Sequence, residues 1–113
     1  MAQTLEQLGQ LRPANTTAAS LFSPTSGEVL VKTVVCCNTS GATAKFRLFH
    51  DDNGTTYDET TALAWDVEVP ADSVATVELN IMMDDSSGNL AVRTDTANAF
   101  TFTAYAYDRD WET

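Results

Sequence analysis

The residue best suited to acid–base chemistry is His50, the only histidine of the chain, which is followed directly by Asp51 and Asp52. A histidine oriented by a carboxylate is the arrangement that activates a serine or cysteine nucleophile. Such a serine commonly stands in a sharp strand-to-helix turn, and the sequence offers no helix with which to build one. We therefore expect His50 to end a strand beside an acidic turn. We expect no catalytic residues and no enzymatic activity.

Acidic residues are numerous, so a catalytic carboxyl pair and a metal site both have to be considered. Glycoside hydrolysis needs two carboxyl groups whose environments separate their pKa values, and no apolar pocket is indicated beside any of these residues. The run from Asp51 to Glu59 is only superficially similar to a calcium loop, because it lacks the D-x-[DN]-x-[DN]-G spacing and flanking helices. Turn formation explains these residues. We expect no metal and no cofactor, with a weak, incidental Ca²⁺ site as the alternative.

Cys36 and Cys37 are the only cysteines, and they are adjacent. Neighbouring side chains of a strand point to opposite faces, so these two thiols are poorly placed to form a disulfide with each other. A zinc site would need further ligands, which a chain with one histidine hardly supplies. We expect both cysteines to act as small apolar strand residues.

The charge of the chain limits its partners. Sixteen acidic residues against six basic ones give a formal net charge of −10, which repels phosphate backbones and anionic membrane surfaces, and no Lys/Arg cluster is visible in the sequence. No apolar run approaches the ~20 residues that cross a bilayer, and the N-terminus lacks the features of a secretory signal. We expect no nucleic-acid partner, no membrane partner and synthesis in the cytosol.

Alternating apolar and polar residues dominate the chain from Leu21 onward, in short segments separated by Gly, Pro, Asn and Asp turns. This pattern is typical of strands with one wet face, and 113 residues fit one domain. We predict an all-β fold, a single antiparallel β-sandwich or jelly-roll-like domain of about seven or eight strands. The predicted divisions are an N-terminal arm (1–17), the sandwich (18–108) and an acidic C-terminal tail (109–113). The predicted strands span residues 19–23, 28–37, 44–50, 63–69, 75–83, 90–94 and 99–107.

The aromatic residues fall into two sets. One set occupies the apolar rows of the predicted strands and is expected in the core: Phe46, Trp65, Phe100 and Phe102. Tyr105 and Tyr107 take the opposite face of the last strand, and Trp111 stands in the tail. Exposed Tyr and Trp often anchor protein interfaces, so these three are candidate partner-binding residues. The alternative is that the tyrosines belong to the second face of a buried strand.

The clearest alternation runs over residues 75–83 and contains Val77 and Leu79. We expect this apolar row to face the core. An aspartate at either position would then bury an unpaired charge and unfold the domain.

Three leucines near the N-terminus, Leu5, Leu8 and Leu11, recur at every third position before Pro13. The spacing indicates a turn or two of helix at most, which is too short to be stable alone. The segment is either a frayed tail or a partner-binding arm whose leucines dock on a neighbouring subunit. If it is an arm, deletion of residues 1–12 should leave a folded protein that no longer binds its partner.

Several segments resemble a recurring pattern of small phage virion proteins. The resemblance is carried by Leu8-Gly9-Gln10-Leu11-Arg12-Pro13-Ala14, Leu21-Phe22-Ser23-Pro24, Cys37-Asn38-Thr39-Ser40-Gly41, Leu63-Ala64-Trp65-Asp66-Val67-Glu68-Val69-Pro70 and Ala91-Val92-Arg93. It covers most of the chain, from about residue 5 to residue 107, and includes no catalytic motif. It implies a non-enzymatic β-sandwich, made in the host cytoplasm and located on the surface of a virus particle.

Within this class, the function that we expect is that of a capsid decoration or cement protein. Such a protein binds the outside of a phage head and stabilises neighbouring capsid subunits by mass action, here through its N-terminal arm. The implied partners are the major capsid protein or other virion proteins, and further copies of the chain, with a trimer favoured. A tail, neck or fibre-base component is the first alternative. A carbohydrate-binding attachment module is the second, and its aromatic platform would have to come from Tyr105, Tyr107 and Trp111.

Overall fold

The structure is a computed structural model that describes residues 5–24, 28–84 and 88–108, and these ranges contain eight strands and no helix. Each strand predicted from the sequence is present, with its ends shifted by no more than one residue. An additional strand precedes them. The strands are β1 (Leu5–Leu11), β2 (Ala19–Phe22), β3 (Glu28–Asn38), β4 (Ala44–Asp51), β5 (Ala62–Val69), β6 (Val74–Asp84), β7 (Asn89–Thr94) and β8 (Phe100–Asp108).

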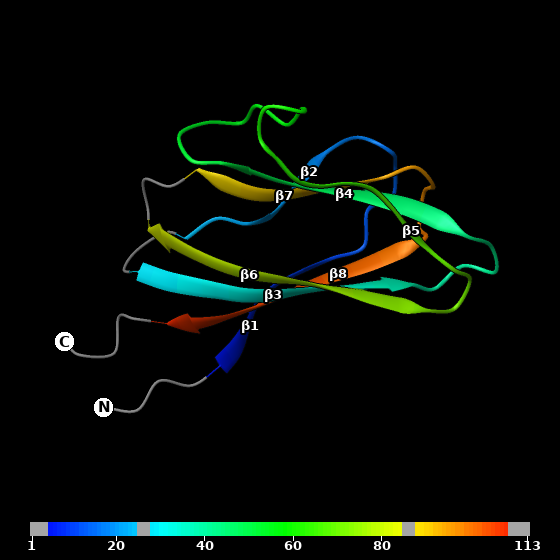
Figure 1. Cartoon of the computed structure of the whole chain (residues 1–113), viewed down its shortest axis with the longest axis horizontal. Coiled ribbons are helices and arrows are strands. Elements are labelled where there is room, and N and C mark those ends of the chain that lie inside the picture. The colour runs from blue at the N-terminus through cyan, green and yellow to red at the C-terminus, as the bar shows by residue number, and fades with distance from the viewer. Residues whose placement is uncertain (1–4, 25–27, 85–87, 109–113) are drawn as a thin grey trace.

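The strands form two four-stranded sheets, sheet A in the order β1-β8-β3-β6 and sheet B in the order β2-β7-β4-β5. Antiparallel pairs join β1 to β8, β2 to β7, β3 to β6 and β4 to β5. The chain therefore pairs with itself as one long ribbon, which is wound into two stacked layers (Figure 1). This nested pairing is that of an eight-stranded jelly roll. The prediction of an all-β sandwich is confirmed.

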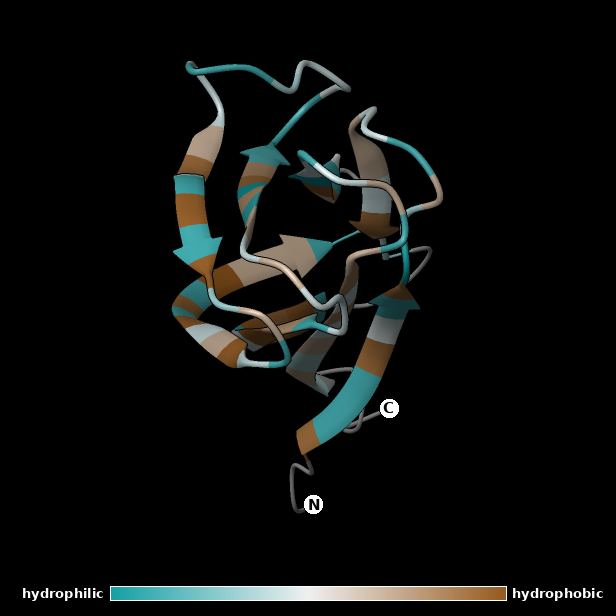
Figure 2. Cartoon of the chain, turned by 90° about the vertical axis from the view of Figure 1, so that its right-hand side faces the viewer, coloured by the Kyte–Doolittle hydropathy of each residue, from teal (hydrophilic) through white to brown (hydrophobic). Residues whose placement is uncertain are grey.

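The core lies between the sheets, where the apolar rows of the central strands meet. Brown and teal bands alternate along the strands, as period-two amphipathic strands require (Figure 2). The ring of Phe46 packs edge-on against Phe100 and Phe102, with centroid distances of 5.6 and 5.8 Å. All three phenylalanines are fully or almost fully buried, as predicted.

Trp65 is 40% exposed, so the prediction that it lies in the core is wrong. The cause is a β-bulge, in which Trp65 and Asp66 of β5 together stand opposite the single residue Arg47 of β4. An extra residue makes the side chains on its two sides exchange faces of the sheet. Asp66 has a φ angle of 52°, a left-handed conformation that a non-glycine residue seldom adopts. The bulge thus turns Trp65 outward while Val67 and Val69, beyond it, pack inward.

A second irregularity lies nearby in β5. Leu48 pairs with Ala64 and Phe49 pairs with Ala62, which leaves Leu63 between them without a partner in the register. Leu63 is 42% exposed. In the sequence, Leu63, Trp65, Val67 and Val69 occupy alternating positions, as in one regular apolar row, and the two irregularities interrupt that row.

The N-terminal leucines lie in strand β1, so the expectation of a turn or two of helix is wrong. β1 pairs with β8 from Leu5 opposite Tyr107 to Leu11 opposite Phe102, and forms one edge of sheet A. A spacing of three would place Leu8 and Leu11 on opposite faces of a regular strand, but a bulge between Gln7 and Gly9 allows both to pack on the core. Leu5–Leu11 are therefore part of the sandwich, and residues 1–4 lie outside the described part.

At Gly9, β1 of sheet A lies close against β2 of sheet B. A Cβ atom at Gly9 would lie 2.6 Å from the carbonyl oxygen of Leu21 and 3.2 Å from Cβ of Phe22, both in β2. The backbones of β1 and β2 can approach this closely only because residue 9 has no side chain. The contact seals the β1–β2 side of the sandwich.

The β6 side is less covered. β6 is the other edge strand of sheet A, and the inner positions from Ala75 to Ile81 are only partly buried, although they pack against the core. Val34 of the neighbouring strand β3, which is paired directly with Val77, is fully buried. The predicted inward face of β6 is thus correct, but its burial is partial.

Candidate functional site

The outer face of sheet B carries a second, smaller apolar cluster. Phe46 and Leu48 of β4 point into the core, so the alternating residues between and beyond them, including Phe49, point outward. Phe49 is nevertheless fully buried, because Tyr57 and Trp65 cover it at ring-centroid distances of 6.0 and 6.2 Å. Tyr57 belongs to the loop that follows β4 and folds back over this face (Figure 1).

Asp51 holds this loop in place. Its nearly buried carboxylate accepts hydrogen bonds from the backbone amides of Asn53, at 3.2 Å, and Thr56, at 2.7 Å. At the other end of the loop, the backbone amide of His50 donates to the carbonyl of Thr61, at 2.9 Å. Burial raises the pKa of the Tyr57 hydroxyl, and the charge of Asp51 acts in the same direction. The acidic turn predicted after His50 therefore has a structural role in the loop.

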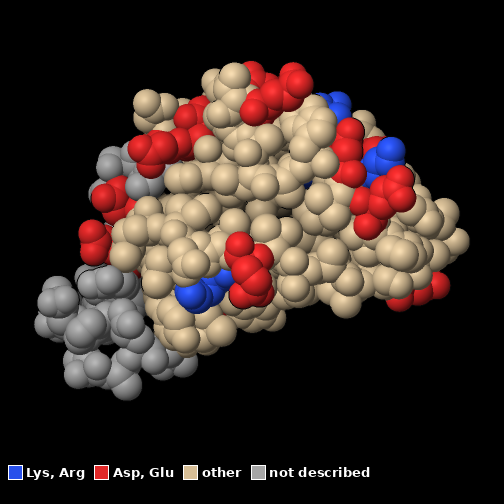
Figure 3. Space-filling view, viewed as in Figure 1, with Lys and Arg blue, Asp and Glu red and all other residues tan. Residues whose placement is uncertain are grey.

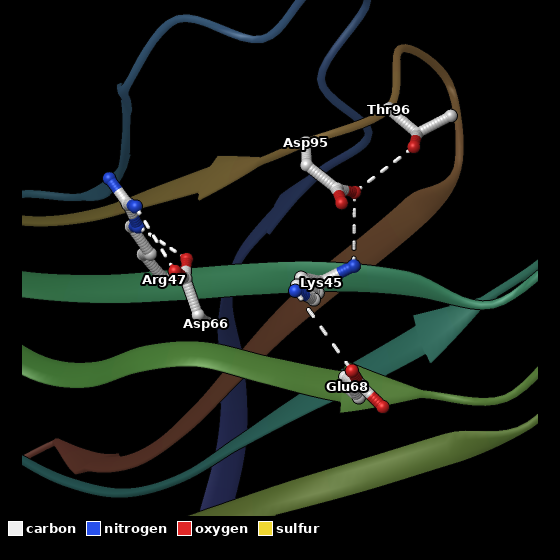
Figure 4. Close-up of polar contacts among 6 residues, drawn as sticks. All are labelled: Lys45, Arg47, Asp66, Glu68, Asp95 and Thr96. Carbon is white, nitrogen blue, oxygen red and sulfur yellow. Dashed lines mark hydrogen bonds and ion pairs between the residues drawn. The ribbon is translucent and has the colours of Figure 1, made fainter.

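A bidentate ion pair on this face joins Arg47 and Asp66. Nε and Nη2 of Arg47 donate to the two carboxylate oxygens of Asp66, at 2.7 and 3.2 Å (Figure 4). This hydrogen bond lowers the pKa of Asp66 and raises that of Arg47. The guanidinium carbon lies 3.7 Å from the centroid of the Trp65 ring. The bidentate contact fixes the guanidinium plane against the ring, which makes Arg47, Trp65 and Asp66 one pre-ordered unit.

A polar hollow of about 260 Å³ adjoins this unit. Arg93 of β7 stands directly opposite Arg47 in the register, and its Nε donates to the carbonyl oxygen of Thr16 at 2.9 Å. Nζ of Lys45 lies 3.9 Å from Oε2 of Glu68. The backbone amide of Lys45 donates to Oδ1 of Asp95 (Figure 4). The residues that line the hollow are Thr16, Lys45, Arg47, Asp66, Arg93, Thr94 and Asp95.

The fold thus gathers three of the six basic residues of the chain, which lie apart in the sequence. Sequence reasoning missed this cluster because the pairing of β4 with β7, which joins Arg47 and Arg93, is not visible in a linear pattern. Carboxylates accompany the basic residues, and Figure 3 shows blue and red groups side by side at this end of the molecule. The cluster therefore does not produce a strongly positive surface.

A second, shallower hollow of about 190 Å³ is lined by Trp65, Ala62 and Glu59. It lies at the Trp65 ring, whereas the polar hollow is lined by the Arg47 that stacks on this ring. The Arg47–Trp65 stack thus contributes one residue to the lining of each hollow. Together they offer an aromatic surface with hydrogen-bond donors and acceptors on either side.

A different surface is formed by the edge of sheet A at β6. Val74 is 58% exposed and Met82 is 42% exposed. Figure 3 shows a broad area around this strand that carries few charged side chains. Exposed apolar side chains on an edge strand are typical of a site at which another chain adds to the sheet.

The predicted partner-binding residues do not form one patch. Leu8 and Leu11 pack on the core of their own chain, whereas Leu5 is 48% exposed and lies directly opposite Tyr107. Tyr105 and Tyr107 are half-buried on β8, a strand with neighbours on both sides. Trp111 lies outside the described residues. Contact of any of them with a partner stays a prediction.

The remaining candidates for chemistry have structural surroundings. Cys36 is fully buried, and burial raises the pKa of its thiol to about 12, whereas Cys37 is half-buried; both are free. Within residues 5–24, 28–84 and 88–108, no three His, Cys, Asp or Glu residues are grouped so that they could hold a metal ion. The same ranges contain no helix long and apolar enough to span a membrane.

Comparison with known proteins gives little further guidance. No family model and no curated protein matches the chain. Among solved structures, a chain from the structure of infectious bursal disease virus, Gx strain, is similar, with a TM-score of 0.44 and 14% sequence identity. The match covers 95% of this chain and 35% of that chain, so this chain spans about a third of the length of its neighbour. At this TM-score and identity, the likeness carries no argument about function.

Proposed function

We propose that the chain is a non-enzymatic structural protein of a virus particle, and specifically a capsid decoration or cement protein on the outside of a phage head. The observation that carries the proposal is the β6 edge, an eleven-residue edge strand that exposes Val74 and Met82. Soluble proteins usually protect such edges with short strands, prolines or many charges. β6 contains no proline, Glu78 is the only charged residue between its two ends, and its pairing with β3 has one irregularity, at Leu79 and Asn80.

An open edge suits a protein that joins a preformed shell. A strand of a capsid subunit can add to sheet A along β6, and binding to the assembled state stabilises that state by mass action. The resemblance to small phage virion proteins supports the same role. The proposed partners are the major capsid protein or other virion proteins and further copies of the chain, in a trimer. The proposed location is the particle surface.

The test compares two lysine substitutions at equally exposed residues. Met82 on β6 and Leu63 on β5 are both 42% exposed, so Met82→Lys and Leu63→Lys should change the stability of the free protein equally little. Met82→Lys should weaken binding to undecorated shells at least tenfold, which is about 1.4 kcal/mol, because it places a charge on the pairing edge. Leu63→Lys should bind as the unmodified protein does. Equal binding of both variants would overturn the role of β6.

The N-terminal segment has to be tested by a substitution that leaves the core intact, not by deletion. Removing residues 1–12 would remove β1 together with Leu8 and Leu11, which pack on the core, so a loss of binding would have two explanations. Leu5→Lys changes only an exposed side chain at the start of β1. If this segment is an arm that contacts a neighbouring subunit, Leu5→Lys should reduce shell binding without lowering the melting temperature. Unchanged binding would remove the arm from the proposal.

A tail, neck or fibre-base component is the alternative within the same class. The two differ in copy number, which gel densitometry of purified particles measures. Hundreds of copies per particle support a location on the head, whereas a few dozen or fewer support the alternative.

A further inference from the structure

We propose that the outer face of sheet B binds a neutral saccharide, one sugar ring of which packs against the part of the Trp65 ring that lines the shallower hollow with Ala62 and Glu59, beside the Arg47 stack. This site is separate from the β6 edge. It does not depend on the proposed role in a virus particle.

The local backbone is built to present this ring. The bulge in β5 keeps Asp66 at a φ of 52° and turns Trp65 away from the core. A regular strand would have placed the large apolar side chain inside, so the irregular backbone and the exposed indole both oppose folding stability. Bulges that redirect a side chain are frequent next to functional sites. Presentation of Trp65 to a ligand accounts for both features.

The ring is also held in a fixed position before any ligand arrives. The guanidinium of Arg47 lies against it at 3.7 Å from the centroid, and Asp66 holds this guanidinium with two hydrogen bonds. The buried ring of Phe49 meets Trp65 edge-to-face, with an interplanar angle of 89°. A site ordered in advance loses little conformational entropy on binding. That matters for a sugar, which buries little apolar area.

The groups around the ring match the chemistry of a sugar. Hydroxyl groups both donate and accept hydrogen bonds, and the two hollows present both kinds of partner. Glu59 supplies acceptors beside Trp65, and Asp95 supplies further acceptors in the polar hollow. Arg93 supplies donors, since within the described part of the chain only its Nε makes a hydrogen bond.

The same groups disfavour a protein partner at this position. The centres of protein interfaces are depleted in charged residues, and covering the Arg47–Asp66 and Lys45–Glu68 pairs with a protein would remove them from water at a cost. A small hydroxylated ligand replaces this water with hydrogen bonds of its own. The net charge of −10 also disfavours polyanionic glycans, so the expected ligand is neutral.

Trp65 and Trp111 are the only tryptophans of the chain, so a Trp111→Phe variant makes Trp65 the sole indole reporter. Titration of this variant with a panel of neutral mono- and oligosaccharides should change its fluorescence for at least one sugar, with a Kd of about 1–10 mM. Saturation-transfer NMR of the same sugar should show contact through its ring protons. Trp65→Ala should abolish this transfer, and Trp65→Phe should retain part of it.

Two further variants distinguish the contribution of the Trp65 ring to sugar binding from that of the residues around it. Leu63→Ala, on the same strand and similarly exposed, should bind the sugar normally. Arg47→Lys keeps the charge but loses the bidentate contact with Asp66, and should weaken binding several-fold. No response to any sugar at about 100 mM, or equal binding by Trp65→Ala, would overturn the proposal. So would a loss of shell binding on Trp65→Ala without any sugar response, since the face would then serve a protein partner.

The experiment distinguishes this proposal from the one for β6. Shell binding should depend on Met82 and be unaffected at Trp65, whereas sugar binding should show the reverse dependence. Either proposal can therefore fail while the other stands.

Discussion

Aspartate substitutions at Val34 and Val77 would measure how open the β6 side of the sandwich is. The two valines are direct cross-strand partners in β3 and β6, and both side chains point inward. Val34 is fully buried, whereas Val77 is only partly buried on the edge strand. The chemical change is identical, so any difference in its effect reports the surroundings alone. The alternation in the sequence predicts unfolding by aspartate at position 77, whereas the structure predicts a folded variant.

The magnitudes follow from burial. Val34→Asp loses about 1.5–3 kcal/mol of apolar burial and adds the several kcal/mol needed to bury a carboxyl group without partners. Their sum is comparable with the whole stability of a small domain, about 5–15 kcal/mol, so Val34→Asp should be unfolded or nearly so at 25 °C. Val77→Asp loses about half as much apolar burial, and its carboxylate can reach water at the sheet edge. Adding the lower β-propensity of Asp gives about 2 kcal/mol.

Circular dichroism and urea titration would test both variants. Val77→Asp should stay folded, with a melting temperature lower by about 10 °C, and Val77→Ala provides the control that removes apolar area without adding charge. If Val77→Asp unfolds as completely as Val34→Asp, then water does not reach the inner face of β6. In that case another chain, for example a second copy of the protein, must cover the edge. Sedimentation of the unmodified protein would identify that case. A folded Val34→Asp would instead mean that the inward face of β3 is assigned incorrectly.

Three further experiments test other parts of the structure. Gly9→Ala should cost about 1–3 kcal/mol, because its Cβ would lie 2.6 Å from a carbonyl oxygen of β2, whereas Gly41→Ala, with no atom within 4 Å, should be neutral in thermal unfolding. Asp51→Asn replaces one of two carboxylate acceptors with a donor and should release the loop after β4 at a cost of about 1–3 kcal/mol; faster proteolysis within residues 52–61 would show it, and unchanged proteolysis would contradict the anchoring role. Cys36 should react with thiol reagents at pH 8 only on unfolding, and Cys37 should react faster. Because burial raises the pKa of Cys36 from 9.0 to about 12, the fold favours the neutral thiol, and the stabilisation present below pH 9 should be lost as the pH rises toward 12.

The fold was predictable because its main signal is local. Most strands after residue 18 show alternation within their own segments, β3 is rich in β-branched residues, and turn residues separate the segments. The incorrect predictions concern positions at which one extra residue in a strand changes the alternation. The bulge beside Gly9 brings Leu8 and Leu11 to one face of a strand at a spacing typical of a helix, and the bulge at Asp66 turns Trp65 outward. Neither bulge has a strong sequence signal, although aspartate is among the non-glycine residues that tolerate a positive φ best.

The candidate sites were less predictable because they depend on the order of strands. Arg47 and Arg93 meet only because β4 pairs with β7, and Trp65 meets Arg47 only because β5 pairs with β4 out of regular register. Similarly, β6 has the most regular alternation in the chain, which predicts a fully buried inner row. Its position at the edge of sheet A, which the alternation does not encode, leaves this row only partly buried from Ala75 to Ile81, whereas Met83 is fully buried.

The sandwich is closed on one side and open on the other, and this asymmetry connects the two proposed surfaces. Gly9 seals the side where β1 meets β2, whereas β5 and β6 are the edge strands of the two sheets on the opposite side. Of the five large hydrophobic residues that are exposed in the described part of the chain, four belong to β5 and β6: Leu63, Trp65, Val74 and Met82. A monomeric sandwich that needed only stability would distribute such residues singly. Their restriction to these two edge strands is the reason to look for ligands and partners there first.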